Sequence, residues 1–123
     1  MNDLYTGLIV VAKVKTIPFI KHVGVVLVEN NQVYILHNTP GRGTVKDTYN
    51  DFFSTRNRAI YYNSDLTKLT NQQLIDRFNN HCQGGFKLLA YNCEHFLRCM
   101  LGTQQQSPQL QKFFLSAVGL LAI

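Results

Sequence analysis

The chain has 123 residues, of which 46% are hydrophobic and 15% are charged. That length and composition are typical of one compact globular domain, and they exclude disordered, collagenous, coiled-coil and repeat architectures. The net charge is +5, but the basic residues are scattered, unlike the basic stripe of a nucleic-acid-binding protein. We therefore expect a single domain over residues 1–123 and no nucleic-acid partner.

The apolar runs and the cysteines indicate where the protein works. The longest apolar runs, residues 8–12 and 113–123, are shorter than the roughly 20 residues that span a bilayer. Asp3 precedes the first run and Lys13 follows it, which is the reverse of a signal peptide. The odd number of cysteines, three, fits a reducing compartment. We expect a cytoplasmic protein that is able to make weak peripheral contact with anionic membranes.

The first half of the chain follows a β pattern. Its β-branched and aromatic residues predict strands at 4–14, 19–28, 33–37, 44–46 and 58–62. A turn at 29–32 joins the second and third strands into a hairpin, and a loop at 38–43 follows it. Residues 48–54 predict one or two helical turns.

The second half of the chain is mainly helical. Thr70 begins a capping box, which predicts a helix over 71–82. A short apolar strand follows at 86–90, and Asn92 caps a second helix. The tail at about 108–123 predicts a third, apolar helix. Strands followed by helices indicate an α+β domain in which a small antiparallel sheet packs against helices.

The length of the hairpin turn determines which residues face each other. A loop of two residues or of four pairs positions whose numbers sum to 61, so that Gly24 faces His37. His22 and His37 then become diagonal neighbours on one face of the sheet, about 7–8 Å apart. Gly24 leaves space there for a third group or a ligand. The sequence thus predicts two imidazoles on one patch.

Cys93 lies at the start of the predicted helix 92–101, on the face that Phe96 and Leu97 turn toward the core. Unpaired N–H groups in the first turn of a helix favour an anion and lower a thiol pKa. A thiolate that faces a pair of histidines is the arrangement of a Cys–His nucleophile, and helix N–H groups can stabilise the oxyanion that forms.

Structural roles for the same residue types stay open. A cysteine on an apolar helix face is more often a core residue than a nucleophile, and a strand histidine is often simply buried or exposed. We expect Cys82 and Cys99 to be structural thiols and His95 to lie on the outer face of its helix. The cysteine and histidine spacings match no zinc motif, so we expect neither a metal nor a cofactor.

The string Asn92-Cys93-Glu94-His95-Phe96, preceded by one strand histidine and by a second at the end of the next strand, resembles the lecithin:retinol acyltransferase-like family. The resemblance covers residues 4–101. It implies a circularly permuted papain-like fold of the NlpC type, with an antiparallel sheet packed against the cysteine helix. It also implies that Cys93 is the nucleophile, His22 the general base and His37 the residue that orients His22.

The family transfers a fatty acyl group from a phospholipid, through a thioester on the cysteine, to water, an amine or an alcohol. The resemblance therefore implies a thiol acyltransferase or phospholipase that acts on a phospholipid or another acyl ester. Asn92 and Arg42 are candidates for oxyanion or substrate contacts, with Arg42 expected to meet a lipid phosphate. The chain departs from vertebrate members at Ile20, where a tyrosine is common, and the acyl acceptor stays open.

Two other functions fit the same residues. Related permuted thiol folds cleave amide bonds, so a cysteine amidase or peptidase is one alternative, and a binding module that kept the fold is another. The presence of both His22 and Cys93 favours an enzyme. The apolar tail at 108–123 is predicted either to pack on the core or to lie at a membrane interface.

Overall fold

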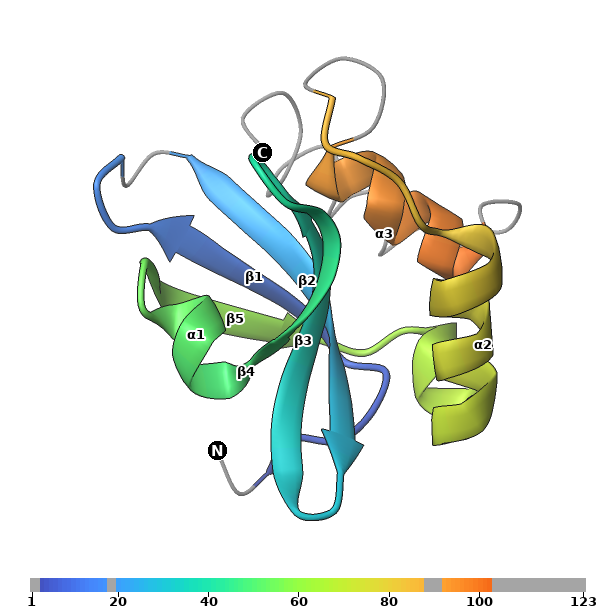
Figure 1. Cartoon of the computed structure of the whole chain (residues 1–123). Helices are drawn as coiled ribbons and strands as arrows, with labels where there is room; N and C mark the ends of the chain where they lie inside the picture. Colours follow the sequence, from blue (N-terminus) through green and yellow to red (C-terminus); the bar gives the residue numbers. More distant parts are fainter. Residues whose placement is uncertain (1–2, 18–19, 88–91, 103–123) are drawn as a thin grey trace.

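One five-stranded antiparallel sheet, with the strand order β4-β3-β2-β1-β5, forms the centre of the fold. The computed structural model describes residues 3–17, 20–87 and 92–102. Figure 1 shows α2 and α3 together on one side of the molecule, away from α1. In chain order the elements are β1 (Ile9–Val14), β2 (Lys21–Glu29), β3 (Gln32–Thr39), β4 (Gly43–Thr48), α1 (Tyr49–Phe53), β5 (Arg56–Tyr62), the 3₁₀ helix η1 (Asp65–Lys68), α2 (Asn71–His81) and α3 (Cys93–Leu101).

The α+β class and the small antiparallel sheet predicted from the sequence are confirmed. The predicted strands of the first half are all present with shifted bounds, and η1 is an addition. Of the predicted strand 86–90, only residues 86 and 87 fall in the described part, and the predicted tail helix 108–123 lies outside it. Among the described residues, no helix is long and apolar enough to cross a membrane.

The first strand differs most from its predicted bounds. It was expected over 4–14 but begins only at Ile9. Gly7 has a φ of +95°, a value that a strand residue does not adopt. A Cβ on Gly7 would lie 2.5 Å from the backbone of Leu66. The chain therefore bends at Gly7 because η1 packs directly against it.

The β2–β3 hairpin has the predicted register. Val28 faces Val33, so that their numbers sum to 61, and all the other pairs follow the same rule. The turn consists of Asn30 and Asn31, whose φ values are 50° and 63°. Two successive positive φ values define a type I′ turn, which matches the right-handed twist of the strands on either side and favours asparagine.

The two strands of the hairpin separate at the end opposite to the turn. Their ladder stops where Val25 faces Leu36. Beyond that point β2 still pairs with β1 as far as Lys21, while β3 still pairs with β4 as far as Thr39. The separated ends of β2 and β3 carry the two histidines that the sequence singled out.

Each face of the sheet has its own hydrophobic core. One core lies under α2 and α3 and contains Val23 and Leu36, and the other contains Phe52 of α1. Successive strand residues point to opposite faces. His22 and His37 therefore share a face with Phe52, whereas Val23 faces α3. The candidate site is formed where these two sides meet, at the separated ends of β2 and β3.

Capping residues set the start of α2 and α3, as predicted. Thr70 forms the capping box of α2. At α3, the Asn92 Oδ1 accepts hydrogen bonds from the backbone N–H groups of Glu94 and His95, at 3.0 Å and 3.1 Å. Gly102 ends α3 in the left-handed conformation, with a φ of +75°.

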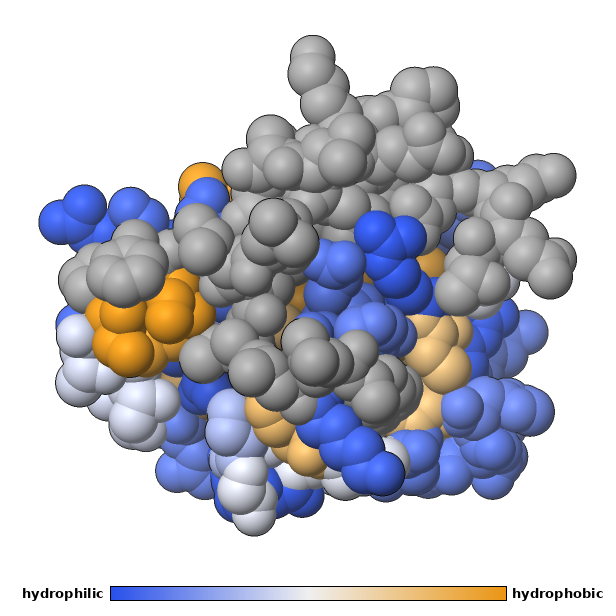
Figure 2. All heavy atoms as spheres, turned by 90° about the horizontal axis from the view of Figure 1, so that it is seen from above, coloured by the Kyte–Doolittle hydropathy of each residue, from blue (hydrophilic) through white to orange (hydrophobic). Residues whose placement is uncertain are grey.

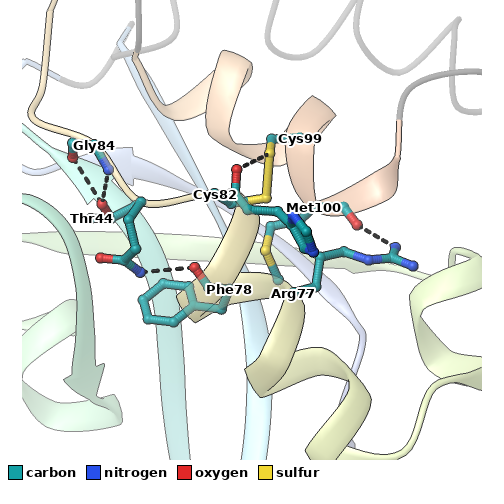
Figure 3. The surroundings of a disulfide bond; sticks show 9 residues. Thr44, Arg77, Phe78, Cys82, Gly84, Cys99 and Met100 are labelled. Atoms are coloured by element: carbon teal, nitrogen blue, oxygen red, sulfur yellow. Dashed lines mark hydrogen bonds between the residues drawn. A yellow bond between two sulfur atoms is a disulfide. The ribbon is translucent and has the colours of Figure 1, made fainter.

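A disulfide bond between Cys82 and Cys99 joins the end of α2 to the last turn of α3 (Figure 3). The prediction of two structural thiols is therefore wrong, and their pairing removes the argument that an odd cysteine count indicates a reducing compartment. Arg77 of α2 donates a hydrogen bond of 2.7 Å to the carbonyl oxygen of Met100 in α3. These links fix α3, and with it the free Cys93, against α2.

Candidate active site

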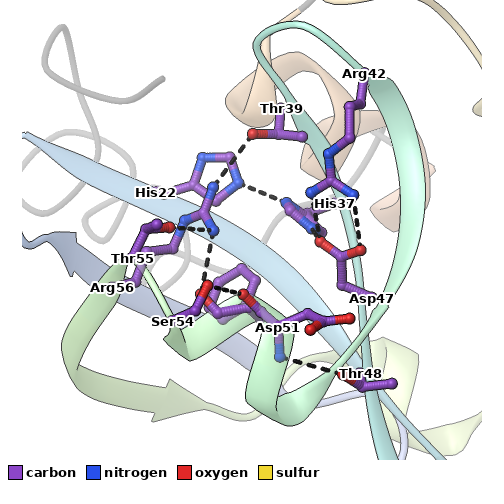
Figure 4. A network of polar contacts seen from close by, with 11 residues as sticks. His22, His37, Thr39, Arg42, Asp47, Thr48, Asp51, Ser54, Thr55 and Arg56 are labelled. Atoms are coloured by element: carbon purple, nitrogen blue, oxygen red, sulfur yellow. Dashed lines mark hydrogen bonds and ion pairs between the residues drawn. The ribbon is translucent and has the colours of Figure 1, made fainter.

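The two predicted histidines are in direct contact. His22 Nε2 lies 2.8 Å from His37 Nδ1, and the side chains are buried, with exposed fractions of 1% and 0%. The Phe52 ring packs against both imidazoles, with ring centroids 5.8 Å from His22 and 5.0 Å from His37. Figure 4 shows His22 and His37 next to each other, at the separated ends of β2 and β3. The predicted convergence of the two imidazoles is confirmed.

The space predicted beside Gly24 is filled. A Cβ on Gly24 would lie 2.6 Å from Ile35 Cγ2 and 3.3 Å from His37 Cβ. The missing side chain thus lets β3 approach β2, and it does not leave room for a ligand. The expectation of an open space between the histidines is wrong because the side chain of the neighbouring strand occupies it.

Asp47 on β4 completes the group, and sequence reasoning missed it. Its Oδ2 lies 2.8 Å from His37 Nε2. Ile35 faces Asp47 in the β3–β4 ladder, so Asp47 is a diagonal neighbour of His37 on the same face. The hairpin arithmetic applied to the predicted loop 38–43 pairs 37 with 44, one residue away from the observed pairing of His37 with Val45, and would put Asp47 on the opposite face. The predicted strand stopped at residue 46 and so left Asp47 out.

The charges of Asp47 and His37 determine the direction of each hydrogen bond. Hydrogen bonds from Arg42, and then from His37, lower the pKa of Asp47 to about 2, although burial opposes the shift. Burial lowers the pKa of His37 to about 4. At neutral pH Asp47 is therefore an anion that can only accept, and His37 is neutral. His37 must carry its proton on Nε2 and donate it to Asp47.

The orientation of His22 follows from that of His37. With its proton on Nε2, His37 has a bare Nδ1, which can only accept the hydrogen bond from His22 Nε2. A neutral His22 is then protonated on Nε2 and bare on Nδ1. The series Asp47, His37, His22 thus holds one defined tautomer and leaves the His22 Nδ1 without a proton.

Arg42, the candidate for a substrate contact, pairs with Asp47 in the structure. Its guanidinium makes two hydrogen bonds to the Asp47 carboxylate, at 2.9 Å and 2.7 Å, and this pairing raises the pKa of Arg42. Its charge is therefore matched within the protein, although half of the side chain, 53%, is exposed. The geometry favours an orienting role for Arg42, which holds Asp47 against His37 (Figure 4).

Cys93 is the first residue of α3 and is fully buried. Its sulfur accepts a hydrogen bond from the backbone N–H of Val23, the residue that follows His22. Val26 N–H points toward β1, where it bonds to Leu8, and N–H directions alternate along a strand. The Val23 N–H therefore points toward β3, into the gap left by the separated strands. The cysteine reaches the sheet at the peptide next to the predicted base.

The thiol of Cys93 is not acidified in this state. Burial raises its pKa to about 12, which outweighs the hydrogen bonds from Val23 and from its own backbone N–H. The predicted lowering of the thiol pKa by the helix start is therefore wrong. The free-energy cost of burying a thiolate exceeds the stabilisation that the two backbone hydrogen bonds provide. At neutral pH the sulfur keeps its proton, so a nucleophilic role requires a base.

Asn92 acts as a helix cap through its side-chain oxygen. The Phe96 N–H bonds to the Asn92 carbonyl oxygen, so the cap uses three N–H groups of the first turn. The remaining one is the N–H of Cys93, which lies close to its own sulfur. Asn92 thus fixes the turn that presents this backbone N–H, and its own side-chain oxygen is used by the cap. His95 is exposed, as predicted.

Arg56 is a second residue that sequence reasoning missed. It begins β5 and lies over the Phe52 ring, with its Cζ 4.7 Å from the ring centroid. It donates to Thr39 Oγ1 at 3.2 Å and to the Phe52 carbonyl at 3.1 Å. No sequence signal marked it, since its place depends on how β5 pairs with β1.

Among the described residues, no group of three or more His, Cys, Asp or Glu side chains is placed to hold a metal ion. The site is instead a set of proton donors and acceptors with one thiol, which suits proton transfer and nucleophilic attack. Compared with family models, with curated proteins and with solved structures, the chain matches none of them.

Proposed function

We propose that this protein is a thiol acyltransferase or phospholipase of the lecithin:retinol acyltransferase-like type, with a permuted papain-like fold. It takes an acyl group from the ester of a phospholipid or a similar lipid and holds it as a thioester on Cys93. The supporting observation is the hydrogen-bonded series Asp47, His37, His22, in which every proton has a defined position. It leaves the Nδ1 of His22 without a proton, and Val23, the next residue of β2, donates its backbone N–H to the protonated thiol of Cys93.

The reaction begins when the His22 Nδ1 takes the proton of Cys93 as the sulfur attacks the ester carbonyl carbon. A carbon–sulfur bond forms, and the carbonyl oxygen becomes an oxyanion that accepts from the Cys93 backbone N–H. The intermediate collapses when the carbon–oxygen bond breaks, and His22 returns the proton to the leaving alcohol. Water, an amine or an alcohol then attacks the thioester, with His22 as base, and regenerates the thiol.

A membrane surface is the proposed place of action. Lys13 near the end of β1 and Lys21 at the start of β2 flank the connection that leads to His22, and this connection carries Lys15 together with Ile17, whose exposed fraction is 37%. Basic residues near an anionic surface contribute about 1 kcal/mol each, and an exposed apolar side chain adds contact with lipid. Figure 2 shows one strongly hydrophobic cluster, at the left of the view, with hydrophilic residues around it.

Intact mass after incubation with phospholipid vesicles tests the chemistry. We expect a mass increase of one fatty acyl group, mapped to Cys93, that is absent from Cys93→Ser and strongly slowed in His22→Ala. An adduct from peptide amides but none from vesicles would move the assignment to a cysteine amidase or peptidase. Absence of any adduct from either substrate class, in folded protein, would refute an acyl-cysteine enzyme.

Flotation tests the membrane location separately. The full chain should float with vesicles that contain anionic lipid at low salt and less at physiological salt, because charge screening shortens the attraction. A Lys13→Gln, Lys21→Gln double variant should float less than a Lys46→Gln, Lys68→Gln double variant, which removes the same number of charges from the surface pairs with Glu29 and Asp65. Equal flotation of the two variants would contradict docking through the β1–β2 connection.

A further inference from the structure

The guanidinium of Arg56 is a cation without an anionic partner beside the candidate site. Within the described residues its contacts are the Phe52 ring and three neutral oxygens, those of Phe52, Thr55 and Thr39. Among the described residues it forms no ion pair, and its Nε is buried with no hydrogen-bond partner. Burial lowers the pKa of Arg56. Holding an unmatched charge in this position destabilises the fold unless something else offsets it.

The nearby charges show what Arg56 can act on. Asp47 faces it from β4, but Arg42, which also faces it from the β3–β4 loop, already binds both oxygens of that carboxylate. His37 from β3 is neutral. From α3, the negative charge of a Cys93 thiolate would interact favourably with Arg56. With the Arg42 and Asp47 charges matched, the site has one excess positive charge while the thiol keeps its proton.

That excess becomes balanced when Cys93 loses its proton. We propose that Arg56 supplies the fixed positive charge that stabilises the Cys93 thiolate when its proton passes to the Nδ1 of His22. In this step the S–H bond breaks, the N–H bond of an imidazolium forms, and Arg56 remains protonated throughout. The inference rests on the proposed role of Cys93 as the nucleophile.

The cation acts in opposite senses on the two reacting groups. It favours the thiolate of Cys93, against the effect of Glu94 on the same helix, which raises the thiol pKa. It disfavours imidazolium, and its charge contributes to the lowered pKa of His37. Since the Arg56 side chain and both histidines lie against the same Phe52 ring, the same effect should reach His22. A neutral side chain at position 56 should therefore raise the pKa of both Cys93 and His37.

The test compares Arg56→Lys with Arg56→Gln, since both lose the guanidinium contacts to Thr39 and Phe52 and only one keeps the charge. The readout is the rate of Cys93 alkylation by iodoacetamide between pH 7 and 9, which needs no substrate. Because Cys93 is buried, each rate is divided by the opening rate of α3 from hydrogen exchange, and the quotient then follows the thiolate fraction. We expect the Lys variant to react about tenfold faster than the Gln variant, the ratio that one pKa unit carries. Arg58→Lys and Arg58→Gln, at an exposed position of the same strand, are the matched control pair and should react equally.

A ratio below about twofold between the Lys and Gln variants, in folded protein, would overturn the proposal and leave Arg56 with a packing role. So would an unchanged His37 pKa in the Gln variant, measured by NMR titration of the imidazole. If Arg56→Gln fails to fold, Arg56→Met keeps the aliphatic stem over Phe52 and takes its place in both measurements. Failure of the acyl adduct test with normal alkylation ratios would refute the proposed function and leave the electrostatic role of Arg56 intact.

Discussion

An Asp47→Asn substitution tests the direction of the protons in the candidate site. Arg42 donates to both oxygens of Asp47, so in the variant it will hold the remaining carbonyl oxygen and repel the amide nitrogen. The nitrogen then takes the place of Oδ2, 2.8 Å from His37 Nε2, and donates to it. His37 must move its proton to Nδ1 and donate to His22 Nε2. His22 is left with its proton on Nδ1, the position that had served as the base.

The expected loss follows from the bonds that must break to restore the base. Two hydrogen bonds of about 1–2 kcal/mol each have to be given up, which slows the reaction about 30- to 1000-fold. The fold should also lose stability. The shift of the Asp47 pKa from 3.8 to about 2 corresponds to roughly 2–3 kcal/mol at neutral pH, because Asp47 is nearly buried and little screened by solvent.

Three measurements check this prediction. The rate of acyl-Cys93 formation from phospholipid vesicles gives the chemical effect, and urea unfolding gives the stability. Nitrogen-15 shifts of the imidazoles report which nitrogen of His22 and His37 carries the proton. Glu29→Gln is the matched control, because it removes a carboxylate from the surface pair with Lys46. A folded Asp47→Asn variant that keeps its rate within threefold, or keeps the wild-type tautomers, would refute the proton order derived from the structure.

Other consequences can be measured on the same protein. His22→Ala should slow acylation of Cys93 by about 10²–10⁴-fold without unfolding the protein. His37→Gln should keep a measurable fraction of the acylation rate, because its amide oxygen can still accept a hydrogen bond from His22. Equal losses of rate in the two variants would contradict this division of roles. Because the pKa of His37 falls from 6.5 to about 4 on folding, the unfolded state binds the extra proton between these values. Stability should therefore be full above pH 6.5 and fall by about 3 kcal/mol as the pH drops to 4, and urea unfolding of His37→Gln should lack this slope. Thiol titration of the denatured chain should find only Cys93 before reduction and all three cysteines after it, since Cys82 and Cys99 are paired; three thiols before reduction would contradict the disulfide.

The residues of each local element were predictable because local rules govern them. The Asn30-Asn31 turn fixes the hairpin register, and the register alone brings His22 and His37 together. The caps at Thr70 and Asn92 start their helices through bonds made within three residues. Such contacts join residues close in sequence, so the chain specifies them before any long-range packing is known.

The features that local rules did not predict depend on contacts between segments that are distant in the sequence. The disulfide required α2 and α3 to bring two Cα atoms within 5.8 Å, which three cysteine positions in a sequence do not reveal. Arg56 depends on the pairing of β5 with β1. The high pKa of Cys93 reflects complete burial, whereas a helix start alone predicts the opposite shift. The sequence by itself therefore determined which side chains could react and which two strands carry the histidines. Only the tertiary structure decided the charge and protonation of each group, because these depend on how much water and which opposite charges the packed chain leaves around it.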